Sequence, residues 1–232
     1  MDNETLQLVL RYIGSATPYR RPKTWDLRQL PYAKLHFGIS AEDGVLRRML
    51  REELGTGQPC AFADIGAFMP YEASNTYYFH TLGWRGVAVD ANPDMAPLWA
   101  DARKGDVFVH AAAGENEGQT YWYRHRYNVG MSCIGEAAKP PSGDFEPSIA
   151  VPMRRLDGIF AQHLAGAPPL TLLCMDLEGS ELPALKSNDW NRWRPRVVMI
   201  EAHDFEIDAP RNHPTVEYLR TQGYRPAASV LG

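Results

Sequence analysis

Residues 61–90 carry the residue types and spacing of a nucleotide-binding α/β unit. A short apolar run contains Asp64 and is followed by Gly66, and a second apolar run ends in Asp90. A glycine after the first strand lets the backbone approach a ligand closely, and a carboxylate at the tip of the second strand suits both hydroxyls of a ribose. Asp90 could instead cap the following turn together with Asn92. Because spacing and context agree, we favour the ribose contact.

The turn after the first apolar run lacks the second and third glycines of a dinucleotide-binding fingerprint. Phe68 and Pro70 stand where a pyrophosphate would need bare backbone. We therefore expect a nucleoside ligand without a diphosphate, of which S-adenosylmethionine (SAM) is the commonest. Two alternatives stay open. The missing glycines argue against the first, a nicotinamide-dependent Rossmann oxidoreductase. The segment Phe68-Met69-Pro70 favours the second, a non-catalytic domain that has lost its cofactor affinity.

Three acids follow the apolar run at residues 170–175, namely Asp176, Glu178 and Glu181. Carboxylates at the tip of a buried strand are costly unless they face a crevice, pair with a partner or accept hydrogen bonds. We expect Asp176 and Glu178 to bind substrate, to act as a general base or to hold a divalent ion. The alternative for Glu178 and Glu181 is that they cap the helix that follows and interact favourably with its dipole.

Glu201 and His203 follow the next apolar run in the same way. A histidine near a reacting hydroxyl is a candidate general base, since its unperturbed pKa is about 6.5. Together with Asp176 and Glu178, these two residues could also form a metal site, for which Mg²⁺ is the candidate ion. The spacing is not diagnostic, and hydrogen-bonded surface groups are an equal alternative.

Small residues close the run at residues 107–112. Ala111 and Ala112, with their neighbours His110 and Ala113, leave room for a flat base such as adenine. Tight packing of a helix on a strand is an equal alternative for any one alanine. Downstream, residues 127–150 have the composition of a long loop, which is often a functional lid.

Five apolar runs separated by helical patterns predict a doubly wound, mostly parallel sheet of α/β class. In the strand order 3-2-1-4-5, the ligand crevice lies over the carboxyl ends of strands one and four. The predicted parallel strands are residues 60–65, 86–90, 107–112, 170–175 and 196–200. An antiparallel strand is predicted at 119–124 and a last strand at 225–230. The predicted helices are residues 3–13, 42–54, 75–82, 94–102, 155–164, 181–185 and 214–222. We expect one domain at residues 56–232, with an N-terminal helical extension, residues 1–55, packed on it.

Composition narrows the class of protein. The chain has 232 residues, 44% of them hydrophobic and 22% charged, as in a soluble globular protein. A formal net charge of −4 disfavours a nucleic-acid partner. The sequence shows neither a signal peptide nor a membrane span, and its 3 cysteines are widely spaced. We expect a cytoplasmic protein with a small-molecule partner and no membrane, with a homo-oligomer as an open option.

An ordered series of short motifs resembles the FkbM family of SAM-dependent methyltransferases. The matching pieces are residues 37–46 (FGISAEDGVL), 62–67 (FADIGA), 74–76 (SNT), 82–86 (LGWRG), 90–93 (DANP), 110–113 (HAAA), 156–157 (LD), 175–181 (MDLEGSE) and 194–201 (RPRVVMIE). Two departures stand out: Asp90 replaces a frequent glutamate, and Phe68-Met69-Pro70 replaces a common Asn-x-Gly.

The resemblance implies O-methylation of a hydroxyl on a sugar or natural product. It also implies a Rossmann-like class I methyltransferase fold with an antiparallel seventh strand, which would need one more strand than the chain up to Gly232 offers. Carried over, Asp64, Gly66 and Asp90 would hold SAM, and Asp176 and Glu178 would lie at the reacting centre. The full set of predicted cofactor contacts is Asp64, Gly66, Ala67, Asn75, Asp90, Ala91, Ala111, Ala112 and Asp176. The predicted catalytic residues are Asp176, Glu178 and His203.

Overall fold

The computed structural model describes residues 36–135, 143–203, 205–206, 209 and 213–230. The helix predicted at residues 3–13 therefore lies outside the described residues. The same holds for much of the proposed extension, so the division into residues 1–55 and 56–232 stays a prediction. None of the helices in these described ranges is long and apolar enough to cross a membrane.

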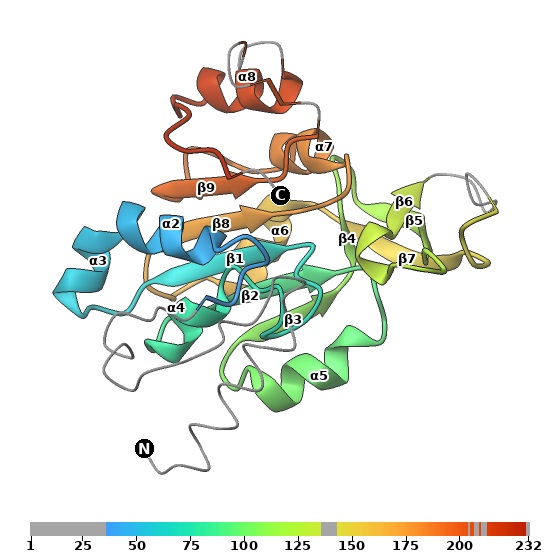
Figure 1. Ribbon diagram of the computed structural model, residues 1–232, viewed down its shortest axis with the longest axis horizontal. Helices are drawn as coiled ribbons and strands as arrows, with labels where there is room; N and C mark the ends of the chain where they lie inside the picture. Colours follow the sequence, from blue (N-terminus) through green and yellow to red (C-terminus); the bar gives the residue numbers. More distant parts are fainter. Residues whose placement is uncertain (1–35, 136–142, 204, 207–208, 210–212, 231–232) are drawn as a thin grey trace, which may run out of the picture. The chain divides into compact units, whose positions relative to one another are not determined.

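A five-stranded parallel sheet forms the centre of the fold (Figure 1). Its strand order β3-β2-β1-β8-β9 confirms the predicted order 3-2-1-4-5, because these strands are the five apolar runs taken in sequence. Every residue of β1 and β8 is buried, as expected for the central strands of a sheet covered on both faces. The strands are β1 (Ala61–Ile65), β2 (Arg85–Asp90), β3 (Val107–His110), β8 (Leu170–Met175) and β9 (Val197–Ile200).

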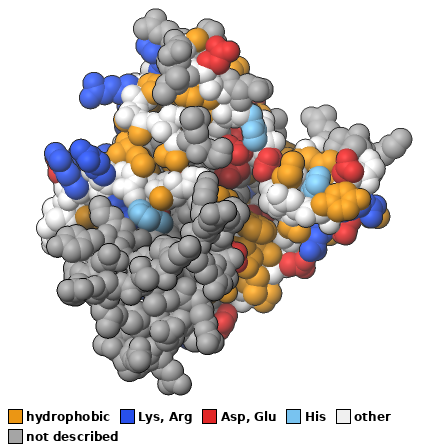
Figure 2. Space-filling model, viewed as in Figure 1, with side chains coloured by type: hydrophobic (Ala, Val, Ile, Leu, Met, Phe, Trp, Pro, Cys, Tyr) orange, Lys and Arg blue, Asp and Glu red, His pale blue; other side chains and the backbone are white. Residues whose placement is uncertain are grey.

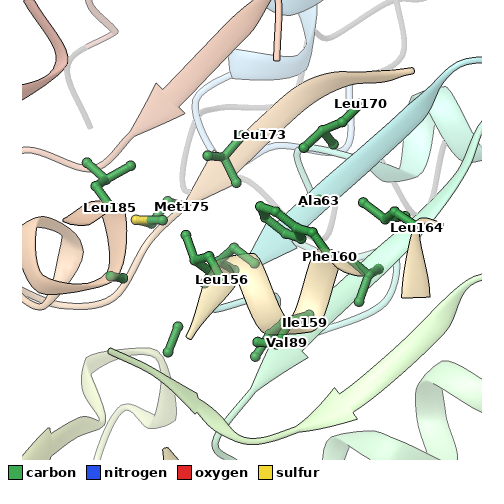
Figure 3. Close-up of a cluster of buried hydrophobic side chains, with 14 of the residues drawn as sticks. Ala63, Val89, Leu156, Ile159, Phe160, Leu164, Leu170, Leu173, Met175 and Leu185 are labelled. Atoms are coloured by element: carbon green, nitrogen blue, oxygen red, sulfur yellow. The ribbon is translucent and has the colours of Figure 1, made fainter. Parts of the chain in front are cut away.

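Helices cover both faces of this sheet. Alternate residues of each strand point to opposite sides, and the apolar residues on both sides are buried under helices. Ala63 of β1 packs against α6, whose Leu156, Ile159 and Phe160 lie on the sheet in Figure 3. Phe62, one residue earlier, belongs to a separate cluster on the other face. The helices are α2 (Glu42–Met49), α3 (Arg51–Thr56), α4 (Tyr77–Thr81), α5 (Met95–Ala102), α6 (Leu156–His163), α7 (Glu181–Lys186) and α8 (Pro214–Thr221).

The helix predicted at 42–54 is interrupted at Leu50, where the backbone ψ is 20°. Leu50 is completely buried and packs with Leu46 against Phe62. The interruption therefore places an apolar side chain in the core and separates α2 from α3. The remaining predicted helices and parallel strands differ from the observed ones only at their ends.

A second, four-stranded sheet adjoins the carboxyl ends of the parallel strands and has the order β4-β7-β5-β6. The predicted antiparallel strand at 119–124 is confirmed as β5, which pairs antiparallel with β6 and β7. Two predictions need correction. The strand predicted at 107–112 ends at His110, and the predicted loop 127–150 contains β6 and the start of β7. The strands are β4 (Ala112–Ala113), β5 (Gly118–Tyr123), β6 (Cys133–Gly135) and β7 (Ile149–Arg154).

The last strand predicted at 225–230 is wrong. These residues are exposed and adopt no regular structure. Tyr224 anchors the segment just before them, since its hydroxyl donates to the Pro195 carbonyl at 2.6 Å and its ring packs on Trp190. A strand that finds no partner and buries no face gains nothing from pairing. No antiparallel strand joins the five-stranded sheet in the described part of the chain.

Candidate functional site

A cavity of about 340 Å³ lies at the carboxyl ends of β1, β2 and β8. Residues of the four-stranded sheet, called the small sheet below, line the side of the cavity opposite these strand ends. Figure 2 shows acidic side chains and a histidine gathered between the two sheets, near the middle of the view. All nine residues predicted to contact the cofactor line this one cavity: Asp64, Gly66, Ala67, Asn75, Asp90, Ala91, Ala111, Ala112 and Asp176. The fold brings them together from five separate parts of the sequence.

Asp90 ends β2 with its carboxylate at the cavity wall. One carboxylate oxygen accepts a hydrogen bond from the backbone N–H of Phe68 and the other from that of Asn92, each at 2.7 Å. Burial raises the pKa of Asp90, and these two hydrogen bonds oppose the rise. Asp90 therefore does cap the turn toward Asn92, as the alternative predicted. Each oxygen still keeps a lone pair for a ligand hydroxyl.

Gly66 follows β1 with a φ of 78°, which a glycine adopts without strain. A Cβ at this position would overlap the backbone carbonyl of Asp176. Gly66 is therefore required because the end of β1 passes directly against the end of β8. The sequence analysis explained Gly66 by the close approach of a ligand to the backbone. In the structure, the group that leaves no room for a side chain at Gly66 is the backbone carbonyl of Asp176.

Asp64 is buried at the end of β1, and Thr76 donates a hydrogen bond to its carboxylate at 2.5 Å. Arg103 in turn donates to the Thr76 hydroxyl at 3.0 Å. Burial raises the pKa of Asp64 to about 6, although the Thr76 hydrogen bond and the Arg103 charge both lower it. Asp64 thus serves as an acceptor with a fixed orientation at the cavity floor.

Small apolar side chains form the wall beside β3. Ala111 and Ala112 are almost completely buried and line the cavity with Trp122 from β5. The Ala111 N–H donates to the carbonyl of Asp90 at 3.0 Å, which ties this wall to the end of β2. The wall is apolar. Ala111 packs in the main core cluster and Ala112 packs with Trp122, so the packing role is confirmed, while the contact with adenine stays a prediction.

Acidic side chains gather at the end of the cavity beside β8 and β9. Asp176, Glu178 and Glu201 line it, whereas His203 is not part of the lining. The His203 imidazole Nε2 lies 3.0 Å from a Glu201 carboxylate oxygen and 3.5 Å from one of Glu178. Glu178, Glu201 and His203 could together hold a metal ion, and Asp176, Glu181 and Glu201 form a second such group.

Glu181 is largely committed to the backbone. Its carboxylate accepts hydrogen bonds from the N–H groups of Leu177 and Gly179, at 2.7 and 3.3 Å. These N–H groups precede α7, and no side chain among the described residues caps that helix, so Glu181 holds the turn before the helix and does not cap it. Its place in the first turn of α7 still suits the predicted interaction with the helix dipole. Glu178 instead adopts a φ of 51°, which is strained for a residue with a side chain. This turn directs the Glu178 carboxylate toward His203.

The sequence profile of the methyltransferase FkbM domain matches residues 64–226. The match covers more than two thirds of the chain and includes every site residue predicted above, from Asp64 to His203. The chain belongs to the FkbM methyltransferase family. No curated protein and no solved structure matches the chain. As a family, FkbM domains transfer methyl groups, so the cavity at the strand tips is the candidate active site.

Asp176 carries the most strongly shifted pKa among the cavity acids of this FkbM domain. Its side chain can be reached from the cavity, but the surrounding protein displaces much of its water. This burial, which is the largest cause, and the neighbouring Glu201 together raise the pKa of Asp176 to about 7. Burial also raises the pKa of Glu178. Asp176 can therefore hold or release a proton near neutral pH.

The raised pKa of Asp176 predicts a pH-dependent stability. The native carboxyl group keeps its proton from about pH 4 to about pH 7, where the unfolded carboxyl has lost it. The native state binds more protons in this window, so the free energy of unfolding falls as the pH rises through it. Asp176→Asn should remove this loss and raise the Tm at pH 8 by about 2 °C, with little change at pH 4.

Thermal unfolding followed by circular dichroism at both pH values checks this prediction. Asp101→Asn, on the exposed face of α5, is the matched control and should leave the difference in Tm between the two pH values unchanged. If the Asp176→Asn variant shows the same difference in Tm between pH 4 and pH 8 as the wild type, the pH dependence does not come from the raised pKa of Asp176.

Sequence reasoning missed two residues that shape the FkbM cavity, Arg103 and Trp99, which lie behind it. Residues 128–134 line its small-sheet side together with Trp122. Trp122, Asn128, Met131 and Ser132 are residues that the sequence itself indicates as a face for a sugar ring or an apolar acceptor, and all four line the cavity. Arg103 offered no signal, since its partners at the cavity, Pro70 and Thr76, lie about 30 residues away in the sequence.

Proposed function

We propose that this protein is a SAM-dependent O-methyltransferase that methylates a hydroxyl of a sugar or natural product, on a class I, Rossmann-like fold. The observation that carries the proposal is the convergence of nine predicted cofactor contacts on one cavity, with the Asp90 carboxylate fixed at its wall. In this arrangement Asp90 would accept hydrogen bonds from the ribose. The alanine wall beside β3 would contact the adenine.

The hydrogen-bond acceptors that line the cavity fit such a cofactor. The Asn75 side-chain oxygen is buried at the cavity wall and has no hydrogen-bond partner among the described residues. A buried acceptor without a partner costs free energy, which a ligand donor would recover. The ammonium group of SAM is such a donor, and the buried Asp64, a second acceptor, lines the same cavity. Asn75 was predicted as a contact, and this unused oxygen supports that role.

When bound, SAM supplies an electrophilic methyl group on its sulfonium. The residues around it bind, orient and move a proton. Alignment of the acceptor hydroxyl with the donor would supply much of the rate. Asp176, with its pKa of about 7, would take the hydroxyl proton as general base. Glu178 and His203 are the alternatives, with His203 acting through the carboxylates that it contacts.

A divalent cation is a second way in which this cluster could serve an acceptor. Glu178, Glu201 and His203 offer oxygen and nitrogen ligands close to one another. A cation such as Mg²⁺ held there would orient and acidify a diol. This remains a proposal beside the general-base role.

A calorimetric titration tests the cofactor. We expect S-adenosylhomocysteine (SAH) to bind the purified protein with a micromolar Kd, because the ribose, base and amino acid contacts do not depend on the transferred methyl. NAD(H) should show no binding, since Phe68 and Pro70 occupy the place where a diphosphate needs open backbone. Binding of NAD(H) without binding of SAH would replace the proposal with the oxidoreductase alternative. Binding of neither would favour the non-catalytic domain.

A further inference from the structure

The turn after β1 holds a non-glycine residue in the left-handed region of backbone conformation. Phe68 adopts a φ of 41°, which costs free energy for a residue with a side chain. Its N–H nevertheless reaches Asp90 at 2.7 Å. Phe68 and Met69 pack against a cluster that contains Trp99 of α5. Something outside the turn must therefore hold the turn in place.

Two side chains behind the cavity bind the carbonyl groups of this turn. The indole N–H of Trp99 donates to the Phe68 carbonyl at 2.8 Å, and the Arg103 guanidinium donates to the Pro70 carbonyl at 2.7 Å. The same guanidinium lies 4.4 Å from the centre of the Trp99 ring, within the range of a cation–π contact. Trp99 and Arg103 thus act as one unit on the turn.

Arg103 is also fixed by the rest of the molecule. It is 1% exposed, and its Nε donates to the Asp106 carboxylate at 2.8 Å. A further N–H donates to Thr76, which donates to Asp64. The guanidinium therefore links the end of α5 to both the turn and the floor of the cavity. Its planar group of five donors is suited to binding several acceptors at once.

We propose that Trp99 and Arg103 are positioning residues that set cofactor affinity through the Phe68–Pro70 turn, although neither lines the cavity. They hold the turn so that its N–H orients Asp90, and Arg103 also orients Asp64 through Thr76. This inference rests on the proposed SAM site, and its test is separable from the test of that site.

Trp99→Phe tests the inference with the smallest change. The phenyl ring keeps most of the buried surface but removes the hydrogen bond to the Phe68 carbonyl. We expect the Kd for SAH, measured by calorimetric titration, to rise about fivefold to tenfold. Trp190→Phe is the matched control, because the Trp190 indole N–H also donates to a backbone carbonyl, that of Leu185. Trp190 belongs to the cluster on the opposite face of the sheet from the cluster that holds Phe68 and Met69. Trp190→Phe should lose comparable thermal stability but no SAH affinity.

Arg103→Lys extends the test. Lysine keeps the charge beside Asp106 but cannot reach the Pro70 carbonyl and the Thr76 hydroxyl together, so we expect about 30-fold weaker SAH binding. If this variant does not fold, Trp99→Phe alone decides. Unchanged SAH affinity in Trp99→Phe, or an equal loss in Trp190→Phe, would overturn the inference. Wild-type protein that binds no SAH would instead overturn the proposed function on which it rests.

Discussion

Asp90→Ala is expected to weaken SAH binding about 100-fold or more. The Asp90 carboxylate is held by the N–H groups of Phe68 and Asn92, so it is already oriented when a ribose arrives. Each hydrogen bond from a ribose hydroxyl to a carboxylate is worth about 1.5–3 kcal/mol, and two of them account for a loss of this size. The substitution also leaves the two N–H groups without acceptors, which adds to the loss. Calorimetric titration of wild type and variant measures the change.

Two further variants make this result specific to the ribose. Asp101→Ala, on the exposed face of α5, removes a carboxylate of the same size and should leave SAH affinity unchanged. Asp90→Asn keeps the shape but loses the charge, so it should fall between wild type and Asp90→Ala. Retained affinity in Asp90→Ala would remove the ribose role of Asp90.

Gly66→Ala is expected to lower the free energy of unfolding by about 4 kcal/mol. A Cβ at residue 66 would overlap the carbonyl of Asp176, and both atoms belong to the rigid backbone of the central sheet. The φ of 78° adds strain for any residue other than glycine. Relief would require β1 and β8 to separate at the cavity. Urea unfolding followed by tryptophan fluorescence measures the change.

Gly83→Ala is the matched control for this prediction. Gly83 has a φ of 90°, but a Cβ there would meet no atom within 4 Å. We expect a cost of about 1 kcal/mol, from backbone strain alone. Equal costs at Gly66 and Gly83 would show that the contact with Asp176 does not matter.

The sequence was sufficient to predict the parallel sheet and the position of the cavity. The run at residues 170–175 is apolar except for Thr171, which is typical of a strand buried on both faces. Polar residues such as Asp90 and Asp176 directly after such runs mark the strand tips, and the parallel topology brings these tips to one edge. Both signals involve residues that are close together in the chain, so they can be recognised in a single sequence.

The small sheet could not be predicted in the same way. Strand β7 includes Pro152, and its partners β5 and β4 lie far from it in the sequence. The strand expected at 225–230 failed because apolar residues such as Val230 do not form a strand without a partner. The interactions of Arg103 and the contact of Gly66 with Asp176 are also tertiary. They arise only when distant segments meet, and no spacing in the sequence encodes them.

A crystal structure of the protein with SAH tests the central claim most directly. We expect density for adenosine across the tips of β1 and β2, with both ribose hydroxyls within hydrogen-bond distance of the Asp90 carboxylate and the base against Ala111 and Ala112. Density for the nucleoside elsewhere, or a ribose that leaves Asp90 without contact, would contradict it.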